Sequence, residues 1–201
     1  MKKNISRKNW IQNQHKDQYF KKSQILGYRS RSAFKLIELN KKFKIIKKNS
    51  SLLDIGSSPG GWSQVTAELI KEGKILAIDK KPMDIVKNVT FLNEDFLEQE
   101  TKDKITAFFG GKIDVVISDM AANTTGNKST DCIRTNYLSM EVLSFALKIL
   151  KSNGSLISKV FMGDDFISVK NFAKKNFKIV KFFKPNSSKS DSKETYIQCT
   201  I

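Results

Sequence analysis

One short stretch decides the fold, and it reads Asp54-Ile-Gly-Ser-Ser-Pro-Gly-Gly-Trp-Ser63. The apolar residues around its start predict a short buried strand, and those after Gly61 recur at the spacing of one helix face. The turn between them contains three glycines and a proline, whereas an ordinary strand-to-helix turn usually needs one glycine. Glycine is required where the backbone takes a positive φ or approaches a ligand closely. Strand, turn and helix together predict a site for a nucleotide-like cofactor at the edge of an α/β sheet.

The turn differs from the dinucleotide-binding pattern G-x-G-x-x-G, whose glycines place a pyrophosphate on the helix N-terminus. Asp54 precedes the first glycine, and a second acid, Asp79, ends the next apolar run at residues 74–79. An acid at the end of the second strand can accept two hydrogen bonds from a ribose diol. S-adenosylmethionine needs such an acceptor and no phosphate site. The D-x-G-x-x-P-G-G pattern followed by Asp79 therefore resembles the S-adenosylmethionine-dependent methyltransferases.

From residue 51 onward, short apolar runs alternate with helical patterns, which predicts a mostly parallel, doubly wound sheet. The expected strands are 51–55, 74–79, 89–92, 113–118, 155–161, 177–183 and 195–201. The expected helices are 32–43, 61–72, 97–109, 131–151 and 164–175. The last two strands are expected to form an antiparallel pair that closes the sheet. We therefore expect an α/β, Rossmann-like methyltransferase fold, with a mostly parallel seven-stranded sheet and helices on both faces.

The net charge of +16 is distributed unevenly along the 201 residues. Residues 1–48 hold fifteen Lys or Arg and two acids, and residues 170–201 hold eight and two. The middle, residues 49–169, holds thirteen and sixteen. Two basic ends beside a near-neutral middle indicate a surface that binds phosphate groups. The alternative is a lysine-rich composition that only covers solvated faces.

The chain length fits one domain with a short extension. We expect a basic N-terminal arm or helix over residues 1–28, whose aromatic side chains suit either base stacking or docking, and a methyltransferase domain over residues 29–201. Cys132 and Cys199 are too few for a disulfide framework and lack metal-ligand spacing, so no metal is expected. The chain shows neither an apolar run of membrane-span length nor an apolar signal-peptide region. A cytoplasmic location without a membrane partner is the expectation.

Two further acids stand at predicted strand ends. Asp95 follows the third strand, where it either accepts a hydrogen bond from an adenine amino group or caps a helix. Asp119 ends the buried run 113–118, on the edge where α/β proteins bind ligands. The residues after Asp119 contain neither the Pro-Pro-aromatic run of methylases that act on exocyclic amines nor the Pro-Cys nucleophile of those that make 5-methylcytosine. The methyl acceptor is therefore expected to be a hydroxyl group.

Five stretches, in this order, carry a specific resemblance. They are Arg29-Ser-Arg-Ser-Ala-Phe-Lys-Leu36, the stretch quoted first, Ser118-Asp-Met-Ala-Ala-Asn123, Ser158-Lys-Val-Phe-Met-Gly163, and Lys184-Pro-Asn-Ser-Ser-Lys-Ser190 with Glu194-Thr-Tyr-Ile197. Together they resemble the RrmJ/FtsJ family of ribosomal RNA large-subunit 2′-O-methyltransferases. Two departures, Ser57-Ser58 for the usual Ala-Ala and Ala122 for a common Pro, remove no catalytic group.

The resemblance implies a set of site residues. The implied catalytic residues are Lys35, Asp119, Lys159 and Glu194, and the implied cofactor contacts are Gly60, Trp62, Asp79, Asp95 and Asp119. It also implies transfer of a methyl group from S-adenosylmethionine to a uridine 2′-hydroxyl of large-subunit (23S) ribosomal RNA, in the assembled or nearly assembled subunit. We expect a monomer. The alternatives are an RNA-binding ribosome-assembly factor and a 2′-O-methyltransferase of tRNA or of an RNA cap.

The four implied catalytic residues also make chemical sense. A ribose hydroxyl is a poor nucleophile, and the chain holds one histidine, His15, so a lysine must act as the base. That role requires the lysine pKa to fall towards neutrality, as burial and a second lysine would make it do. We assign Lys159 as the base because it ends a buried strand. Lys35 then positions the ribose or phosphate, and Asp119 and Glu194 orient the two lysines.

Overall fold

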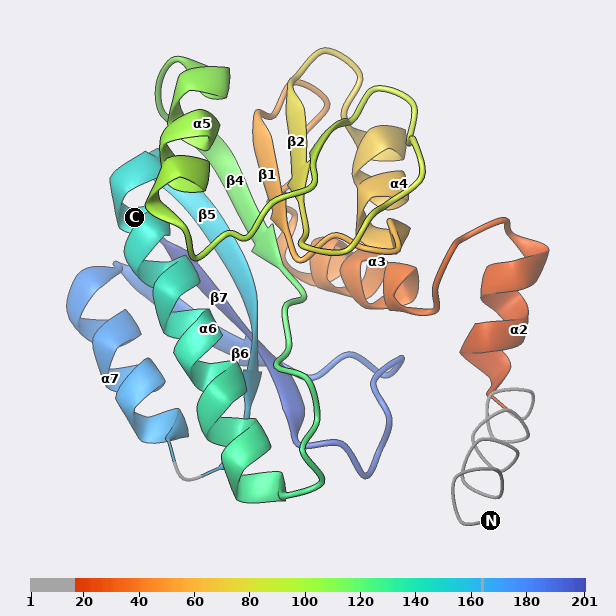
Figure 1. Ribbon diagram of the computed structural model, residues 1–201, viewed down its shortest axis with the longest axis vertical. Helices are drawn as coiled ribbons and strands as arrows, with labels where there is room; N and C mark the ends of the chain where they lie inside the picture. The colour runs from red at the N-terminus through yellow and green to blue at the C-terminus, as the bar shows by residue number, and fades with distance from the viewer. Residues whose placement is uncertain (1–16, 164) are drawn as a thin grey trace.

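The computed structural model describes residues 17–163 and 165–201, so residues 1–16 of the predicted basic arm, including His15, lie outside the described residues. Within the described chain, seven strands form one sheet in the order β3-β2-β1-β4-β5-β7-β6 (Figure 1). The strands are β1 (Leu52–Ile55), β2 (Ile75–Ile78), β3 (Thr90–Leu92), β4 (Ile113–Ser118), β5 (Leu150–Phe161), β6 (Ile179–Phe183) and β7 (Glu194–Thr200).

The first five strands of the chain pair in parallel, and β7 pairs antiparallel with both β5 and β6. The predicted fold class, a mostly parallel α/β sheet closed by an antiparallel pair, is thereby confirmed. The largest boundary difference is at β5, which starts at Leu150, where Leu150 pairs with Ile113, and not at residue 155. The preceding helix accordingly ends at Ile149 and not at residue 151.

Helices cover both faces of the sheet (Figure 1). They are α2 (Gln18–Ile25), α3 (Ser32–Phe43), α4 (Gly61–Leu69), α5 (Gln99–Phe109), α6 (Lys128–Ile149) and α7 (Phe166–Asn176). One apolar cluster joins the sheet to α5, α6 and α7, and a second joins it to α3 and α4. Burying apolar side chains on both faces explains why the strands read as continuous apolar runs.

The glycine-rich turn brings the ends of β1 and β4 close together. Gly56 has a φ of +79°, and a Cβ there would lie 3.1 Å from the backbone N and Cα of Met120. An L side chain is therefore excluded by both conformation and space. Gly60, with a φ of 110°, is the N-cap of α4. The turn following β1 thus packs directly against the loop that follows Asp119.

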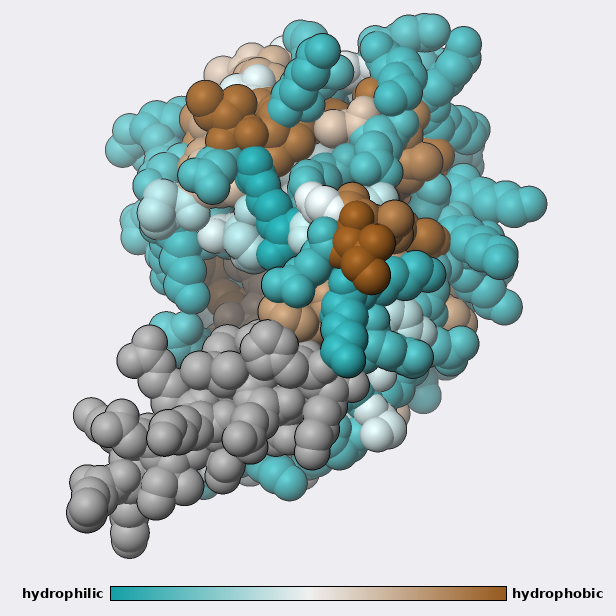
Figure 2. Space-filling view, turned by 90° about the vertical axis from the view of Figure 1, so that its right-hand side faces the viewer, coloured by the Kyte–Doolittle hydropathy of each residue, from teal (hydrophilic) through white to brown (hydrophobic). Residues whose placement is uncertain are grey.

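The described end of the predicted arm is a docked helix. Asp17 caps α2 by accepting hydrogen bonds from the backbone N–H groups of Tyr19 and Phe20. The Tyr19 ring lies 5.6 Å from the Phe34 ring of α3, so α2 packs on the domain. Figure 2 shows the side that carries α2 and α4 covered mainly by hydrophilic side chains, with separate small apolar patches. No helix within residues 17–163 and 165–201 has the length and apolar character to cross a membrane.

Candidate active site

A buried lysine lies at the end of β5, where it meets the end of β4. Lys159 Nζ lies 2.7 Å from Asp119 Oδ1 and donates a hydrogen bond to the Asp119 backbone oxygen at 2.8 Å. The Lys159 side chain is 8% exposed and that of Asp119 16%. Parallel pairing places both residues at the carboxyl edge of the sheet, since Ser118 pairs with Ser158. The two residues are thus neighbours because of strand register.

Glu194, the first residue of β7, joins a second lysine to this pair. Its Oε1 lies 2.7 Å from Lys35 Nζ, and its Oε2 lies 3.4 Å from Lys159 Nζ. Lys35 comes from α3, which brings an N-terminal residue onto the edge of a C-terminal strand. We call Lys35, Asp119, Lys159 and Glu194 the edge cluster. The structure therefore brings the four implied catalytic residues into contact.

The electrostatics of the edge cluster differ from the sequence-based expectation. Burial lowers the pKa of Lys159, but the charges and hydrogen bonds of Asp119 and Glu194 outweigh burial and raise it above its usual value. The expected depressed pKa of Lys159 was therefore wrong. Burial raises the pKa values of Asp119 and Glu194, and the two lysines nevertheless hold both below the usual range. Asp119, Lys159 and Glu194 are consequently charged at neutral pH.

A cavity of about 800 Å³ opens along the same sheet edge. Its walls come from the ends of the first four strands and from the N-terminal half of α6. Predicted residues Asp79, Asp95 and Asp119 all line it, together with Gly56, Ser58 and the loop residues 120–123. In doubly wound folds this edge is where ligands bind. Asp119 therefore belongs to both the cavity and the edge cluster.

Asp79 and Asp95 are held in place with capacity for further hydrogen bonds. Asp79 accepts one backbone N–H on each oxygen, from Ser58 and from Lys81. Asp95 accepts from Lys80 Nζ at 2.9 Å and from the Leu97 backbone. Burial raises the pKa of Asp95, but these two bonds bring it below its usual value. A carboxylate oxygen accepts two hydrogen bonds, so each side chain can bind a donor in the cavity.

The alternative prediction, that Asp95 caps the next helix, was wrong, since the N-cap of α5 is Glu98. Gly60 and Trp62, the other predicted cofactor residues, do not line the cavity. Trp62 is 2% exposed, donates its Nε1–H to the Ser32 backbone oxygen, and packs on the Tyr196 ring at 5.8 Å. Its position in the apolar face of α4 accounts for that burial.

Sequence reasoning missed three side chains that support the edge cluster. Tyr196 is fully buried and donates its hydroxyl to Asp119 Oδ1 at 2.6 Å, and Ser188 donates to Glu194 Oε1 at 2.9 Å. Glu38 accepts from the backbone N–H groups of residues 186 and 187, which anchors the loop before β7 to α3. Tyr196 lies two residues after Glu194 on the same strand face, which was the available signal.

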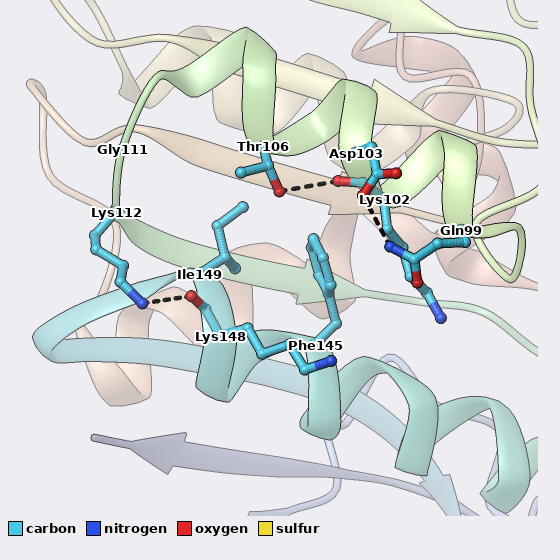
Figure 3. Close-up of a pocket in the computed structure, with 9 residues that line it drawn as sticks. All are labelled: Gln99, Lys102, Asp103, Thr106, Gly111, Lys112, Phe145, Lys148 and Ile149. Carbon is cyan, nitrogen blue, oxygen red and sulfur yellow. Dashed lines mark hydrogen bonds between the residues drawn. The ribbon is translucent and has the colours of Figure 1, made fainter.

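A smaller cavity, of about 330 Å³, lies elsewhere (Figure 3). It is formed by α5, the C-terminal half of α6 and the loop before β4, and Phe145 and Ile149 form part of its wall. These elements meet at the amino edge of the strands, opposite the edge that carries Asp119. None of the predicted site residues lines this cavity. No group of His, Cys, Asp and Glu side chains suited to a metal ion occurs in the described part of the chain.

Comparison with known proteins agrees with this geometry. Residues 28–201 match the family model described as FtsJ-like methyltransferase. A relative from Pelagibacter ubique, named "Ribosomal RNA large subunit methyltransferase E", is 47% identical over 201 residues, 100% of this chain and 99% of the relative. The crystal structure of a protein from Plasmodium falciparum, described as a ribosomal RNA methyltransferase, is 35% identical with a TM-score of 0.77, covering 86% of this chain and 97% of that chain.

A more distant structure shares the fold. It is a protein from Streptococcus mutans, described as a methyltransferase in complex with SAH, with a TM-score of 0.55 and 18% identity. The match covers 82% of this chain and 95% of that chain. At this identity the likeness shows the fold alone.

Proposed function

The chain belongs to the FtsJ-like methyltransferase family, and from that premise we propose that it methylates a uridine 2′-hydroxyl of large-subunit ribosomal RNA with S-adenosylmethionine as donor. The observation that carries this proposal is the position of Asp119. This residue lines the cavity that holds Asp79 and Asp95, and it pairs with Lys159 of the edge cluster. A donor in the cavity and an acceptor at the cluster would therefore meet at one side chain.

The residues of the cavity fit the proposed donor. Asp79 can accept hydrogen bonds from a ribose diol, and Asp95 can accept from an adenine amino group. The buried Oδ1 of Asp54, under the glycine-rich turn, has no hydrogen-bond partner within the described chain, which suits a cationic amino-acid end nearby. When bound, S-adenosylmethionine supplies a methyl group already activated by a positively charged sulfur. The chain then has to hold the acceptor hydroxyl in line and remove its proton.

Lys159 Nζ is the group that we propose accepts this proton. Asp119 and Glu194 raise the pKa of Lys159, so its amine carries a proton at neutral pH. An additional positive charge bound beside Asp119 lowers the pKa of a nearby ammonium group, so the lysine can lose its proton once the cavity is filled. Asp119 and Glu194 keep the nitrogen fixed in direction through their contacts at 2.7 and 3.4 Å. Alignment of the acceptor then supplies much of the acceleration.

Lys35 is proposed to position the acceptor nucleotide. Its ammonium is held by Glu194 at 2.7 Å and lies 6.0 Å from the centre of the Tyr196 ring. A cation at this point can contact a phosphate or ribose oxygen of RNA. The net charge of +16, gathered in the two terminal parts of the chain, supports an RNA partner. We further propose that the protein acts as a monomer on the assembled or nearly assembled large subunit, in the cytoplasm.

Methylation of isolated subunits tests the proposal. Large subunits from a strain that lacks the gene are incubated with the purified protein and labelled S-adenosylmethionine, and the ribosomal RNA is digested to nucleosides. Label in 2′-O-methyluridine is the expected result. Label in a base-methylated nucleoside, or in tRNA alone, would overturn the assignment. A Lys159→Ala protein that restores subunit assembly in that strain without any methyl transfer would favour a binding factor instead.

A further inference from the structure

A second groove opens on the far side of the edge cluster from the cofactor cavity. It has a volume of about 560 Å³ and lies between the start of α7, the end of β6 and the start of β7. The side chains that matter here are Met162, Phe166, Lys170, Phe182, Lys193 and Glu194. Within the described chain, this groove and the cofactor cavity share no lining residue. Of these six residues, only Glu194 has a role in the proposed mechanism.

The groove has an exposed apolar wall. The Phe166 and Phe182 rings lie 5.1 Å apart and are tilted by 57°. Phe182 is 36% exposed and Met162 49% exposed. Phe166 packs against the core, which accounts for its position, but the core does not account for Phe182 and Met162 at the surface. Exposed aromatic and thioether groups in a basic protein provide faces on which an unstacked base can lie.

Two lysines border this wall. Neither Lys170 nor Lys193 has an ion-pair partner among the described residues. Lys184, the third lysine of the groove, donates to the backbone oxygens of Ser190 and Ser192. Glu194 is the one carboxylate among the described lining residues, and both lysines of the edge cluster contact it. The groove therefore favours an anion that also has an apolar face.

Strand continuity links the groove to the reaction. Phe161 pairs with Glu194, and the Met162 backbone N–H donates to the Lys193 oxygen at 2.8 Å. Met162 and Lys193 of the groove thus directly continue the strands that carry Lys159 and Glu194. Because the cofactor cavity takes up the Asp119 side of the cluster, an RNA strand with its ribose at Lys159 has to leave on the Glu194 side. Glu194 lines the groove, so the groove borders the edge cluster on that side.

We propose that this groove binds one unpaired nucleotide adjacent to the methylated one, an inference that rests on the proposed function. The base lies on Phe182 and Met162, and the phosphate contacts Lys170 and Lys193. Such a contact positions the acceptor strand without touching the donor. It also predicts that the enzyme requires an unpaired flanking nucleotide, since a paired base cannot lie on a protein ring.

Two sets of variants separate stacking from charge. Phe182→Leu keeps an apolar side chain but loses the aromatic face, whereas Phe182→Trp keeps the face. The expected KM for large subunits rises about tenfold for Phe182→Leu, the scale of one stacked base, and stays within about twofold for Phe182→Trp. Lys170→Ala combined with Lys193→Ala should reduce the slope of log affinity against log salt by between about one and two. Lys181→Ala, which removes a charge from β6 outside the groove, serves as the matched control and should leave the KM unchanged.

Calorimetric S-adenosylmethionine affinity and Tm are measured for every variant and should equal those of the parent. Groove variants that keep the parental KM and salt slope overturn the inference. A Phe182→Leu protein that shows both a higher KM for subunits and a lower cofactor affinity also overturns it. A parent protein that transfers no methyl group to subunits overturns the proposed function and the inference resting on it. A methylating parent with unaffected groove variants overturns the groove alone.

Discussion

Lys159 Nζ contacts both the side chain and the backbone carbonyl of Asp119, at 2.7 and 2.8 Å. The carbonyl contact fixes the nitrogen relative to the end of β4, independently of the rotamer of the carboxylate. A charge-assisted hydrogen bond of this kind is among the stronger ones in proteins. The proposed base is therefore held in position before any substrate arrives, and it is held in its protonated form.

The rate of methyl transfer should consequently rise with pH through the neutral range. A lysine whose pKa is raised carries its proton at neutral pH, and only the neutral amine accepts a proton from the hydroxyl. The measurement is the single-turnover rate on large subunits at saturating cofactor, between about pH 6 and pH 9. A rate that stays constant over this range would show that proton removal by Lys159 does not limit the reaction.

Replacing Lys159 by Ala should lower that rate by about two to four orders of magnitude, the usual contribution of a positioned base. Cofactor affinity should be preserved, because Lys159 does not line the cavity. Lys151→Ala, on the exposed start of the same strand, is the matched control and should behave as the parent. If Lys159→Ala turns over within a few-fold of the parent, Lys35 becomes the candidate base.

Asp79→Ala should weaken S-adenosylmethionine binding by roughly 1.5–3 kcal/mol, the scale of hydrogen bonds to a charged group. Part of this loss will come from the backbone at Ser58 and Lys81, because their N–H groups donate hydrogen bonds to the Asp79 carboxylate that the substitution removes. Calorimetry measures the affinity directly. Asp103→Ala, in the cavity of Figure 3, should leave it unchanged. The opposite ranking of these two variants would move the cofactor to that other cavity.

Asp54→Asn should change how stability depends on pH. Burial, and after it the charges of Asp119 and Asp79, raise the pKa of Asp54 to about 7 against a hydrogen bond from Ser63. When a carboxyl has a higher pKa in the folded protein than in the unfolded chain, the folded protein becomes less stable as pH rises from the unfolded pKa to the folded pKa. The reason is that the unfolded chain releases the proton at a lower pH. The Tm of the variant minus that of the parent should therefore increase between about pH 4 and pH 7. A constant difference would mean that Asp54 is ionised throughout.

Affinity for large subunits should fall steeply with salt, because the basic ends displace counter-ions from phosphates. Deleting residues 1–16 removes five Lys or Arg and no acid, and leaves α2 intact, so the log–log slope should flatten. Cofactor affinity in the deletion variant provides the control and should not change. Binding that ignores salt would mean that the net charge of +16 plays no part in RNA recognition.

The periodicity of the sequence predicted the strands and helices because both faces of this sheet are buried. Four-residue strands such as Leu52–Ile55 are apolar throughout or nearly so, and a parallel sheet needs such runs. Local pattern was weaker at boundaries. The extra turn at the start of α6 exists because Asn127 accepts from the N–H groups of Ser129 and Thr130, a cap that the expected start at residue 131 overlooked.

The sequence could not predict what depends on contacts between distant residues. The pKa of Lys159 is set by a balance between burial and two carboxylates, and only the distances decide which effect is larger. The contacts of Arg31 were also beyond the reach of local pattern. Its guanidinium donates hydrogen bonds to the cap residue Asp17 and to the backbone oxygen of Ser187. These partners are far apart in sequence. Their contact depends on the packing of α3 against the loop before β7.

The strand order has a consequence for synthesis of the protein. β7 lies between β5 and β6, and it carries Glu194, which contacts Lys35 from the beginning of the domain. While the ribosome is still translating residues up to 183, β6 has no neighbour in the sheet and both lysines of the edge cluster lack this carboxylate. A nascent chain can therefore form the glycine-rich turn early but cannot complete its chemistry. The edge cluster is complete only once β7 has inserted between β5 and β6.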